Sequence, residues 1–341
     1  VNISLIVPEN NFTLIEKCRN LGVEVFIYEP DNLTELKETW IKGLKKADVA
    51  VCTVQPPRDG YHCIALAAEC IYKNGNNTVL MPKTGTIVPE YKREYYIPDV
   101  RVKTRIITIT GFTKKYLINE YKIPEHVIEI IYHGANLSKF SSNESTKNES
   151  CKRYPIDHSK NLPVLGVVGT LEERKGHSVL LHAVKLLEET AYPEIMAVFV
   201  GDGPNLNLLK GVVEGLDLKD NVTFYPYTDQ ANYIYEQIDI LVLPSLYREG
   251  LPNVLLEAMA MGIPCIASDI AGVSEIVKDD YTGYLVRPGN VADLADKIAL
   301  MWSDHKKCRR LGDNIKDFIY ENFDRNKQAH KYLEFFENAV N

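Results

Sequence analysis

Several features that would assign the chain to common protein classes are missing from its sequence. Its 341 residues contain no run approaching about eighteen apolar residues, so no membrane-spanning helix is predicted. No secretory signal is expected either. Seven cysteines are scattered without a Cys-x-x-Cys pair, which argues against a disulfide framework and predicts reduced thiols in a cytoplasmic protein. The eight histidines show no metal-ligand spacing, which argues against a histidine-based metal site.

Basic residues are also outnumbered by acidic residues. The chain has 39 Lys and Arg against 46 Asp and Glu, a formal net charge of −7. The imbalance is uneven, because residues 1–150 carry 19 basic and 18 acidic residues whereas residues 151–341 carry 20 and 28. Nucleic acid is not an expected partner, since its binding requires a basic face.

One local concentration of basic residues interrupts this pattern. It comprises Lys83, Lys92, Arg93, Arg101, Lys103 and Arg105. A solvated loop is the favoured interpretation. Contact with a phosphorylated acceptor or an anionic membrane surface is the alternative. We therefore expect the protein in the cytoplasm. If it contacts a membrane peripherally, the expected location is the inner face of the cell membrane.

Short apolar runs alternate with amphipathic stretches along the whole chain, which is typical of repeated βα units and parallel sheets. The length favours two domains, each large enough for its own core. We expect domains over residues 1–143 and 144–322, followed by a helix over 323–341 that starts after a break near 322–324. The polar segment 141–150 is predicted to be a linker or an exposed loop.

The most informative stretch runs from Arg248 to Gly262. It follows the apolar run Ile240–Leu243, which predicts a strand buried on both faces. Pro252 stands where the first turn of a helix over 253–261 is expected, a position that tolerates its missing N–H. A loop therefore leads into the open N–H groups of a helix, which form a ready anion site.

Glu257 is anomalous in this predicted helix, because its neighbours are apolar nearly all round. A carboxylate there costs on the order of several kcal/mol unless it is paired. It shares a helix face with Asn253, and its side chain leans toward the helix start. Glu249 and Glu257 therefore flank one helix N-terminus. A structural ion pair is the alternative role for Glu257.

Two further loops carry residues suited to binding an anion. Residues Gly169 to His177 follow a predicted strand over 163–169 and open a helix, and the adjacent cations Arg174 and Lys175 match the charge of a departing diphosphate. Gly201-Asp-Gly-Pro204 ends the next strand in a turn whose glycines allow close approach of a ligand. The segment 225–228 follows the strand after that.

These motifs, in this order between about residues 163 and 290, resemble the retaining glycosyltransferases of family 4, which have the GT-B fold. Glu249 and Glu257, with seven residues between them, resemble the double-glutamate motif of that family. The resemblance implies an α/β GT-B protein with two doubly wound Rossmann-like domains that face a central cleft. The first domain would select the acceptor and the second would bind the donor, with the terminal helix crossing back to the first.

The resemblance also implies a role for each motif residue. Lys175 would stabilise the leaving diphosphate without a metal or cofactor, Glu249 would orient the sugar hydroxyls, and Glu257 would hold the ribose. Lys175 and Glu249 are the predicted catalytic residues. The other predicted donor contacts are Arg174, Thr170, Gly203, Tyr227, Gly250, Leu251, Pro252 and Asn253.

The sequence departs from the family pattern at three places. Thr170 stands where most members have Arg, and Arg174 is expected to compensate. The first βα unit, with its glycine-rich loop, looks missing or reduced. Many members have a histidine near the donor sugar, and Lys83 stands at the equivalent position in this sequence. Lys83 is therefore a candidate contact to donor or acceptor. His62 and His133 are alternatives for that histidine.

The resemblance predicts a retaining glycosyltransferase that moves a hexose or N-acetylhexosamine from a nucleoside-diphosphate sugar to a glycan or lipid-linked acceptor. UDP is favoured over GDP as the nucleotide. A sugar-nucleotide epimerase on the same scaffold is one alternative, and it requires acid–base residues in the first domain. A non-catalytic subunit that binds the nucleotide sugar is another, and it predicts binding without hydrolysis or transfer.

Overall fold

A computed structural model describes residues 2–54, 60–87, 91–158, 163–190, 192, 195–303 and 305–341. The chain divides into two compact units, Val1–Ile131 with Lys331–Asn341, and Tyr132–His330. Within the described residues all sheets are parallel, and helices alternate with strands along the chain. The predicted α/β class is therefore confirmed.

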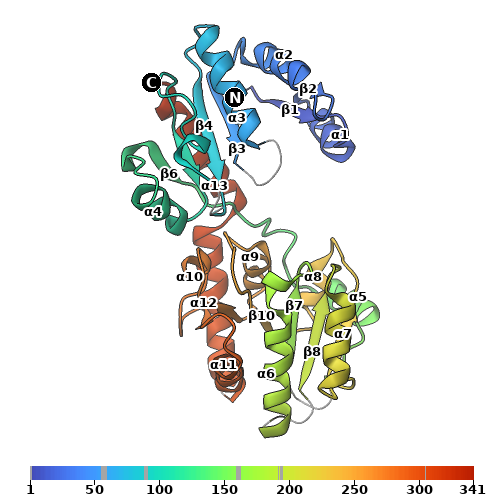
Figure 1. Cartoon of the computed structure of the whole chain (residues 1–341). Helices are drawn as coiled ribbons and strands as arrows, with labels where there is room; N and C mark the ends of the chain where they lie inside the picture. The colour runs from blue at the N-terminus through green and yellow to red at the C-terminus, as the bar shows by residue number, and fades with distance from the viewer. Residues whose placement is uncertain are drawn as a thin grey trace. The chain divides into compact units, whose positions relative to one another are not determined.

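The first unit contains two parallel sheets among its described residues, β1-β2 and β3-β4-β5-β6 (Figure 1). Its elements are β1 (Ser4–Pro8), α1 (Phe12–Asn20), β2 (Glu24–Tyr28), α2 (Leu33–Leu44), β3 (Val49–Thr53), α3 (Gly60–Lys73), β4 (Val79–Thr84), η1 (Arg93–Tyr95), β5 (Ile106–Thr108), α4 (Gly111–Asn119), η2 (Glu125–Val127) and β6 (Ile128–Ile130).

The larger sheet of this unit is buried on both faces. Leu80 of β4 belongs to a core that includes buried residues of α2 and α3, whereas its neighbours Val79 and Met81 belong to a second core. Successive strand residues point to opposite faces, which explains this division. Tyr332 and Phe336 of α13 (Arg325–Val340) pack against the second core, so the end of the chain covers that face of the sheet.

The second unit is built on one parallel sheet in the order β12-β11-β10-β7-β8-β9 (Figure 1). Its elements are α5 (Glu144–Arg153), β7 (Val164–Val168), η3 (Glu173–Lys175), α6 (His177–Thr190), β8 (Met196–Val200), α7 (Leu206–Gly215), β9 (Val222–Tyr225), α8 (Ala231–Tyr235), β10 (Ile240–Leu243), α9 (Asn253–Ala260), β11 (Cys265–Ser268), α10 (Val273–Ile276), β12 (Gly283–Val286), α11 (Val291–Ser303) and α12 (His305–Asn322).

The order of this sheet reverses between β7 and β10. Strands β7 to β9 follow one another toward one edge of the sheet, and β10 to β12 follow one another toward the opposite edge. The parallel strands β10 and β7 pair where the order reverses, with Ile240 and Leu241 opposite Leu165 and Gly166. In open parallel sheets, ligands bind outside the carboxyl ends of the strands at such a switch point. The loops that follow β7 and β10 are therefore neighbours at the position where a ligand is expected.

The predicted linker over 141–150 is wrong, because most of it forms α5. Asn143 begins this helix in a capping box, in which its side chain accepts the N–H of Thr146 and the Thr146 hydroxyl accepts the N–H of Asn143. Ser150 is fully buried and donates a hydrogen bond to the carbonyl of Tyr233 in α8. Tertiary packing against α8 therefore stabilises a polar segment that has little apolar periodicity of its own.

The break expected near 322–324 is present, since α12 ends at Asn322 and α13 begins at Arg325. The Asp324 carboxylate caps the new helix by accepting the N–H groups of Asn326 and Lys327, each at 2.9 Å. None of the described helices is both long and apolar enough to cross a bilayer.

Several members of the basic concentration contact backbone carbonyls of their own unit. Arg93 donates to the carbonyl of Lys122 at 2.9 Å, and Lys103 donates to that of Ala339 at 2.7 Å. Arg105 donates to the carbonyl of His126. These three side chains therefore join separate segments of the first unit, a structural role that the sequence did not predict.

Candidate functional site

The loops after β7 and β10 meet in a buried ion pair. The Lys175 ammonium lies 2.6 Å from Oε1 of Glu249, whose side chain is only 6% exposed. The hydroxyl of Ser245, a fully buried residue, donates to the same carboxylate oxygen at 2.6 Å. A buried charge requires partners of this kind, and here a cation and a hydroxyl satisfy it. The structure thus brings the two predicted catalytic residues together.

Backbone contacts hold these two loops in register. Gly176 adopts a left-handed φ of +64°, and a Cβ on it would lie 2.0 Å from the carbonyl oxygen of Pro244. The N–H of Leu246 donates to the carbonyl of Arg174 at 2.7 Å. Because glycine has no Cβ, the chain can turn here directly against the end of the β10 strand. Lys175 is thereby fixed one residue before the turn.

Arg174 lies beside this pair and contacts both loops. Its guanidinium is 2.7 Å from a carboxylate oxygen of Glu172 and 3.6 Å from Oε1 of Glu249. It also donates to the carbonyl of Arg248 at 3.1 Å. Arg248 has a φ of +59°, which is uncommon for a residue with a side chain. Two cations therefore converge on one carboxylate at the loop between β10 and α9.

Helix α9 begins at the end of the same loop. Pro252 is its N-cap residue, one position earlier than the first-turn place that the sequence predicted, and no side chain caps the helix. Gly250, Leu251 and Asn253 line this start, where the His133 ring contacts the carbonyl of Leu251 at 2.8 Å. The first N–H groups of a helix that lacks a side-chain cap are suited to an anion.

Glu257 lies one turn into α9 and accepts a hydrogen bond from the Tyr235 hydroxyl at 3.0 Å. Its partner is thus a neutral hydroxyl, and not the cation of the ion pair considered as its alternative role. Burial raises the pKa of Glu257, while the Tyr235 hydrogen bond and the charge of Lys139 oppose that rise. The carboxylate is only partly buried, so it keeps access to a ligand.

The glycine-rich turn after β8 packs against the loop after β7. A Cβ on Gly201, where φ is +147°, would lie 2.0 Å from the carbonyl oxygen of Gly169, and one on Gly203 would lie 2.4 Å from that of Leu171. Thr170 is exposed between these contacts. Both glycines are therefore required for close approach of the two backbones.

Tyr227 lies beyond the next strand and is 70% exposed, so it is not a core residue. Its N–H donates to the Asp202 carboxylate at 3.2 Å, which ties this segment to the glycine-rich turn. The predicted contact of Tyr227 with the donor stays a prediction.

Lys83 belongs to the first unit, where its ammonium lies 5.1 Å from the centre of the Tyr332 ring. Its predicted contact with donor or acceptor is not tested by this arrangement. The side chain of His62 lies outside the described residues. His133 is in the second unit beside Leu251, as described above.

Sequence reasoning missed three residues that support the site. Glu172 pairs with Arg174, Ser245 donates to Glu249, and Tyr235 donates to Glu257. Ser245 follows a predicted strand by two residues and lies four residues before Glu249, which is the signal that could have found it. Tyr235 carries no local signal of its partner, which lies 22 residues further along the chain.

His177 follows the Lys175 loop and is buried against Phe199, with ring centres 5.9 Å apart. Burial lowers its pKa to about 4 from 6.5, since the charged imidazolium loses its hydration. The unfolded chain therefore binds the proton more tightly than the folded chain between pH 6.5 and 4. We expect this residue to reduce the free energy of unfolding by about 3 kcal/mol as the pH falls through that window.

A His177→Phe variant tests this expectation, because it keeps a ring of similar shape and removes the titration. Urea unfolding of both proteins at several pH values gives the two stability curves. The parent should lose stability more steeply than the variant below pH 6.5. Parallel curves would show that His177 does not titrate in this way.

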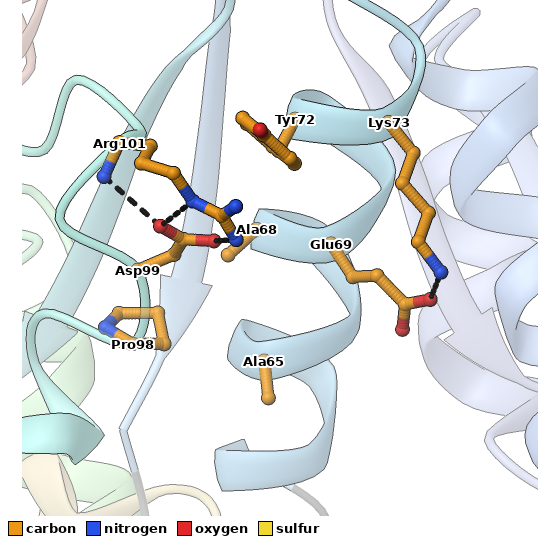
Figure 2. A pocket seen from close by; sticks show the side chains of 8 residues that line it. All are labelled: Ala65, Ala68, Glu69, Tyr72, Lys73, Pro98, Asp99 and Arg101. Carbon is orange, nitrogen blue, oxygen red and sulfur yellow. Dashed lines mark hydrogen bonds and ion pairs between the residues drawn. The ribbon is translucent and has the colours of Figure 1, made fainter.

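A separate hollow of about 300 Å³ lies in the first unit between α3 and residues 98–101, and Figure 2 shows its lining. Arg101 stacks 3.6 Å from the centre of the Tyr72 ring and pairs with Asp99 at 2.7 Å. Glu69 pairs with Lys73 at 2.6 Å. Its charged groups are thus paired with one another, and none of the predicted site residues lines it.

Comparison with known proteins gives the site a context. Residues 151–318 match the family model described as Glycosyl transferases group 1. The UDP-Gal:alpha-D-GlcNAc-diphosphoundecaprenol alpha-1,3-galactosyltransferase of Escherichia coli is 27% identical over 239 residues, which cover 70% of this chain and 61% of that protein. The N-acetyl-alpha-D-glucosaminyl L-malate synthase of Bacillus anthracis is 26% identical over 209 residues, covering 61% and 53%. The chain thus spans about half to three-fifths of the length of these relatives.

The fold can be compared over almost the whole chain. The crystal structure of Anabaena Alr3699/HepE in complex with UDP matches with a TM-score of 0.84 at 16% identity, covering 98% of this chain and all of that chain. The family model and this likeness together confirm a glycosyltransferase of the GT-B type with two Rossmann-like domains, and they are consistent with family 4. Through residues 151–318 the chain belongs to the group 1 glycosyl transferases, and its fold is that of the GT-B glycosyltransferases.

Proposed function

We propose that the chain is a retaining glycosyltransferase of family 4 that transfers a hexose or N-acetylhexosamine from a nucleoside-diphosphate sugar. The observation that carries the proposal is the buried Lys175–Glu249 pair at the switch point of the sheet. Lys175 comes from the loop after β7, and Glu249 comes from the loop that leads into α9. This arrangement supplies cations and open N–H groups for a diphosphate, and carboxylates for the hydroxyls on either side of it.

The donor would lie along the loops of the second unit. Its ribose would bind to Glu257. Because Oε2 of Glu257 accepts a hydrogen bond from the Tyr235 hydroxyl, Oε1 is the oxygen that would accept one from a ribose hydroxyl. Gly203 and Tyr227 would border the base. UDP is the favoured nucleotide. The structurally similar Anabaena protein was crystallised in complex with UDP, which supports this choice.

Catalysis would act on the charge that develops as the anomeric bond to the diphosphate breaks. Lys175, assisted by Arg174 and Thr170 at the loop and by the N–H groups of Gly250, Leu251 and Asn253, would stabilise the leaving diphosphate. The described contacts of Glu249 to Lys175, Arg174 and Ser245 all use Oε1, which leaves Oε2 to orient the sugar hydroxyls.

The acceptor oxygen would form its bond to the anomeric carbon on the face that the diphosphate leaves, which retains the configuration. The departing phosphate oxygen would take the acceptor proton, so no separate general base is assigned. No metal or other cofactor is part of the proposal.

The proposed acceptor is a glycan or a lipid-linked sugar. The name of the E. coli relative includes a diphosphoundecaprenol-linked sugar as acceptor, which supports the lipid-linked class. Such an acceptor would bring the reaction to the inner face of the cell membrane, and the protein would then contact that membrane peripherally. Lys83 is the proposed contact of the first unit with donor or acceptor.

Nucleotide binding followed by donor turnover tests the proposal. Thermal unfolding with UDP, GDP and ADP should give the largest rise in melting temperature with UDP, and UDP-sugars should then be hydrolysed slowly or transferred to an acceptor. Stabilisation by UDP without any turnover would support a binding subunit, whereas conversion of one UDP-sugar into its epimer would support the epimerase. If none of the three nucleotides raises the melting temperature, the proposed donor site is refuted.

A Glu257→Ala variant tests the ribose contact. Because the hydrogen bonds of a charged group contribute about 1.5–3 kcal/mol, UDP affinity measured by calorimetry should fall by about 10- to 100-fold. Glu214→Ala is the matched control, since the Glu214 carboxylate of α7 is exposed and pairs with Lys219. Equal affinity of parent and Glu257→Ala would remove Glu257 from the site.

A further inference from the structure

The Tyr235 hydroxyl is the only polar atom of a side chain that is otherwise enclosed. Tyr235 is 1% exposed, and its ring is tilted against that of the buried Phe140 with centres 6.1 Å apart. A buried tyrosine hydroxyl needs a hydrogen-bond partner, and here that partner is Oε2 of Glu257 at 3.0 Å. The ring position is therefore set by packing, and the carboxylate position follows from the hydroxyl.

From this contact we infer that Tyr235 is a positioning residue for the donor ribose, which is an inference that rests on the proposed function. Tyr235 binds one oxygen of Glu257 and directs the other, Oε1, toward the ribose hydroxyls. The hydroxyl belongs to α8, whereas Glu257 belongs to α9, so the contact fixes the carboxylate from outside its own helix.

The chemistry of the carboxylate supports this assignment. A glutamate side chain has three rotatable bonds, and holding it in one rotamer before the ligand arrives lowers the entropy cost of binding. The donated hydrogen bond also favours the ionised carboxylate over the protonated one, although burial raises the pKa of Glu257. An ionised and fixed carboxylate is a stronger acceptor for a ribose hydroxyl than a protonated or mobile one.

A Tyr235→Phe variant separates this role from a general effect on folding. It should weaken UDP binding by about 5- to 10-fold and leave the affinity for 2′,3′-dideoxy-UDP within about twofold, since that nucleotide lacks both hydroxyls. The ratio of the two affinities, measured by calorimetry in one preparation, does not depend on the fraction of folded protein. Equal losses for both nucleotides would show a structural role and overturn the inference.

A second measurement uses the Glu257→Ala background. With the carboxylate absent, adding Tyr235→Phe should change UDP affinity by less than about twofold, whereas independent effects would multiply. Multiplying losses would overturn the inference.

Tyr233→Phe is the matched control, because it removes a hydroxyl from the same helix. The Tyr233 ring lies under the Arg153 guanidinium at 4.5 Å, away from Glu257, and UDP affinity should not change. If the parent itself binds UDP and 2′,3′-dideoxy-UDP equally, the ribose assignment of the proposed function fails together with the inference. A failure seen only in Tyr235→Phe leaves the proposed function intact.

Discussion

Replacing Lys175 by Ala should reduce the turnover number by about 100- to 1,000-fold, because removing one group that stabilises a developing charge costs about 2.7–4 kcal/mol in the transition state. The ammonium is held 2.6 Å from Glu249 before any donor binds, so it needs little reorganisation when the diphosphate leaves. Donor hydrolysis or sugar transfer under saturating donor gives the turnover number directly.

The control for this variant is Lys219→Ala. Lys219 is 64% exposed and pairs with Glu214 on the surface of the same unit, so its loss should leave turnover unchanged. Lys175→Ala also deprives the buried Glu249 of its nearest cation, and circular dichroism should accompany the assay to verify folding. A folded Lys175→Ala protein with the turnover of the parent would exclude Lys175 from catalysis.

The second large effect is expected at Gly176. Its φ of +64° disfavours any side chain, and a Cβ would lie 2.0 Å from the Pro244 carbonyl oxygen at the end of β10. Gly176→Ala should therefore lower the free energy of unfolding by about 2–4 kcal/mol, since the loop must move away from the strand. Urea unfolding measures this loss, and activity should fall with it because Lys175 precedes the turn.

Gly211→Ala is the matched control for this prediction. Gly211 lies in α7, and a Cβ there meets nothing within 4 Å. Alanine favours a helix interior over glycine, so this variant should be neutral or more stable by up to about 1 kcal/mol. If both alanine variants have the same stability, the close approach at Gly176 does not constrain the fold.

The sequence was most informative where periodicity and loop chemistry coincide. The apolar run at β10, the loop after it and the start of α9 could be placed within a residue or two, because a parallel strand buried on both faces leaves a simple pattern. Glu257 could be singled out because a carboxylate is costly among apolar neighbours, and Glu249 because it flanks the start of the same helix.

Contacts between distant segments could not be read in the same way. Tyr235 and Glu257 are 22 residues apart, and only the packing of α8 against α9 brings them together. The helix α5 was missed for a related reason, because its stability comes from a capping box and from burial of Ser150 against α8. Local polarity alone favoured a loop there.

A crystal structure of the chain with UDP is the most direct test of the donor site. The account predicts phosphate oxygens within hydrogen-bond distance of the Lys175 ammonium and of the N–H groups that begin α9. It also predicts a ribose hydroxyl on Oε1 of Glu257. Electron density for UDP at another position, with no contact to these groups, would contradict the account.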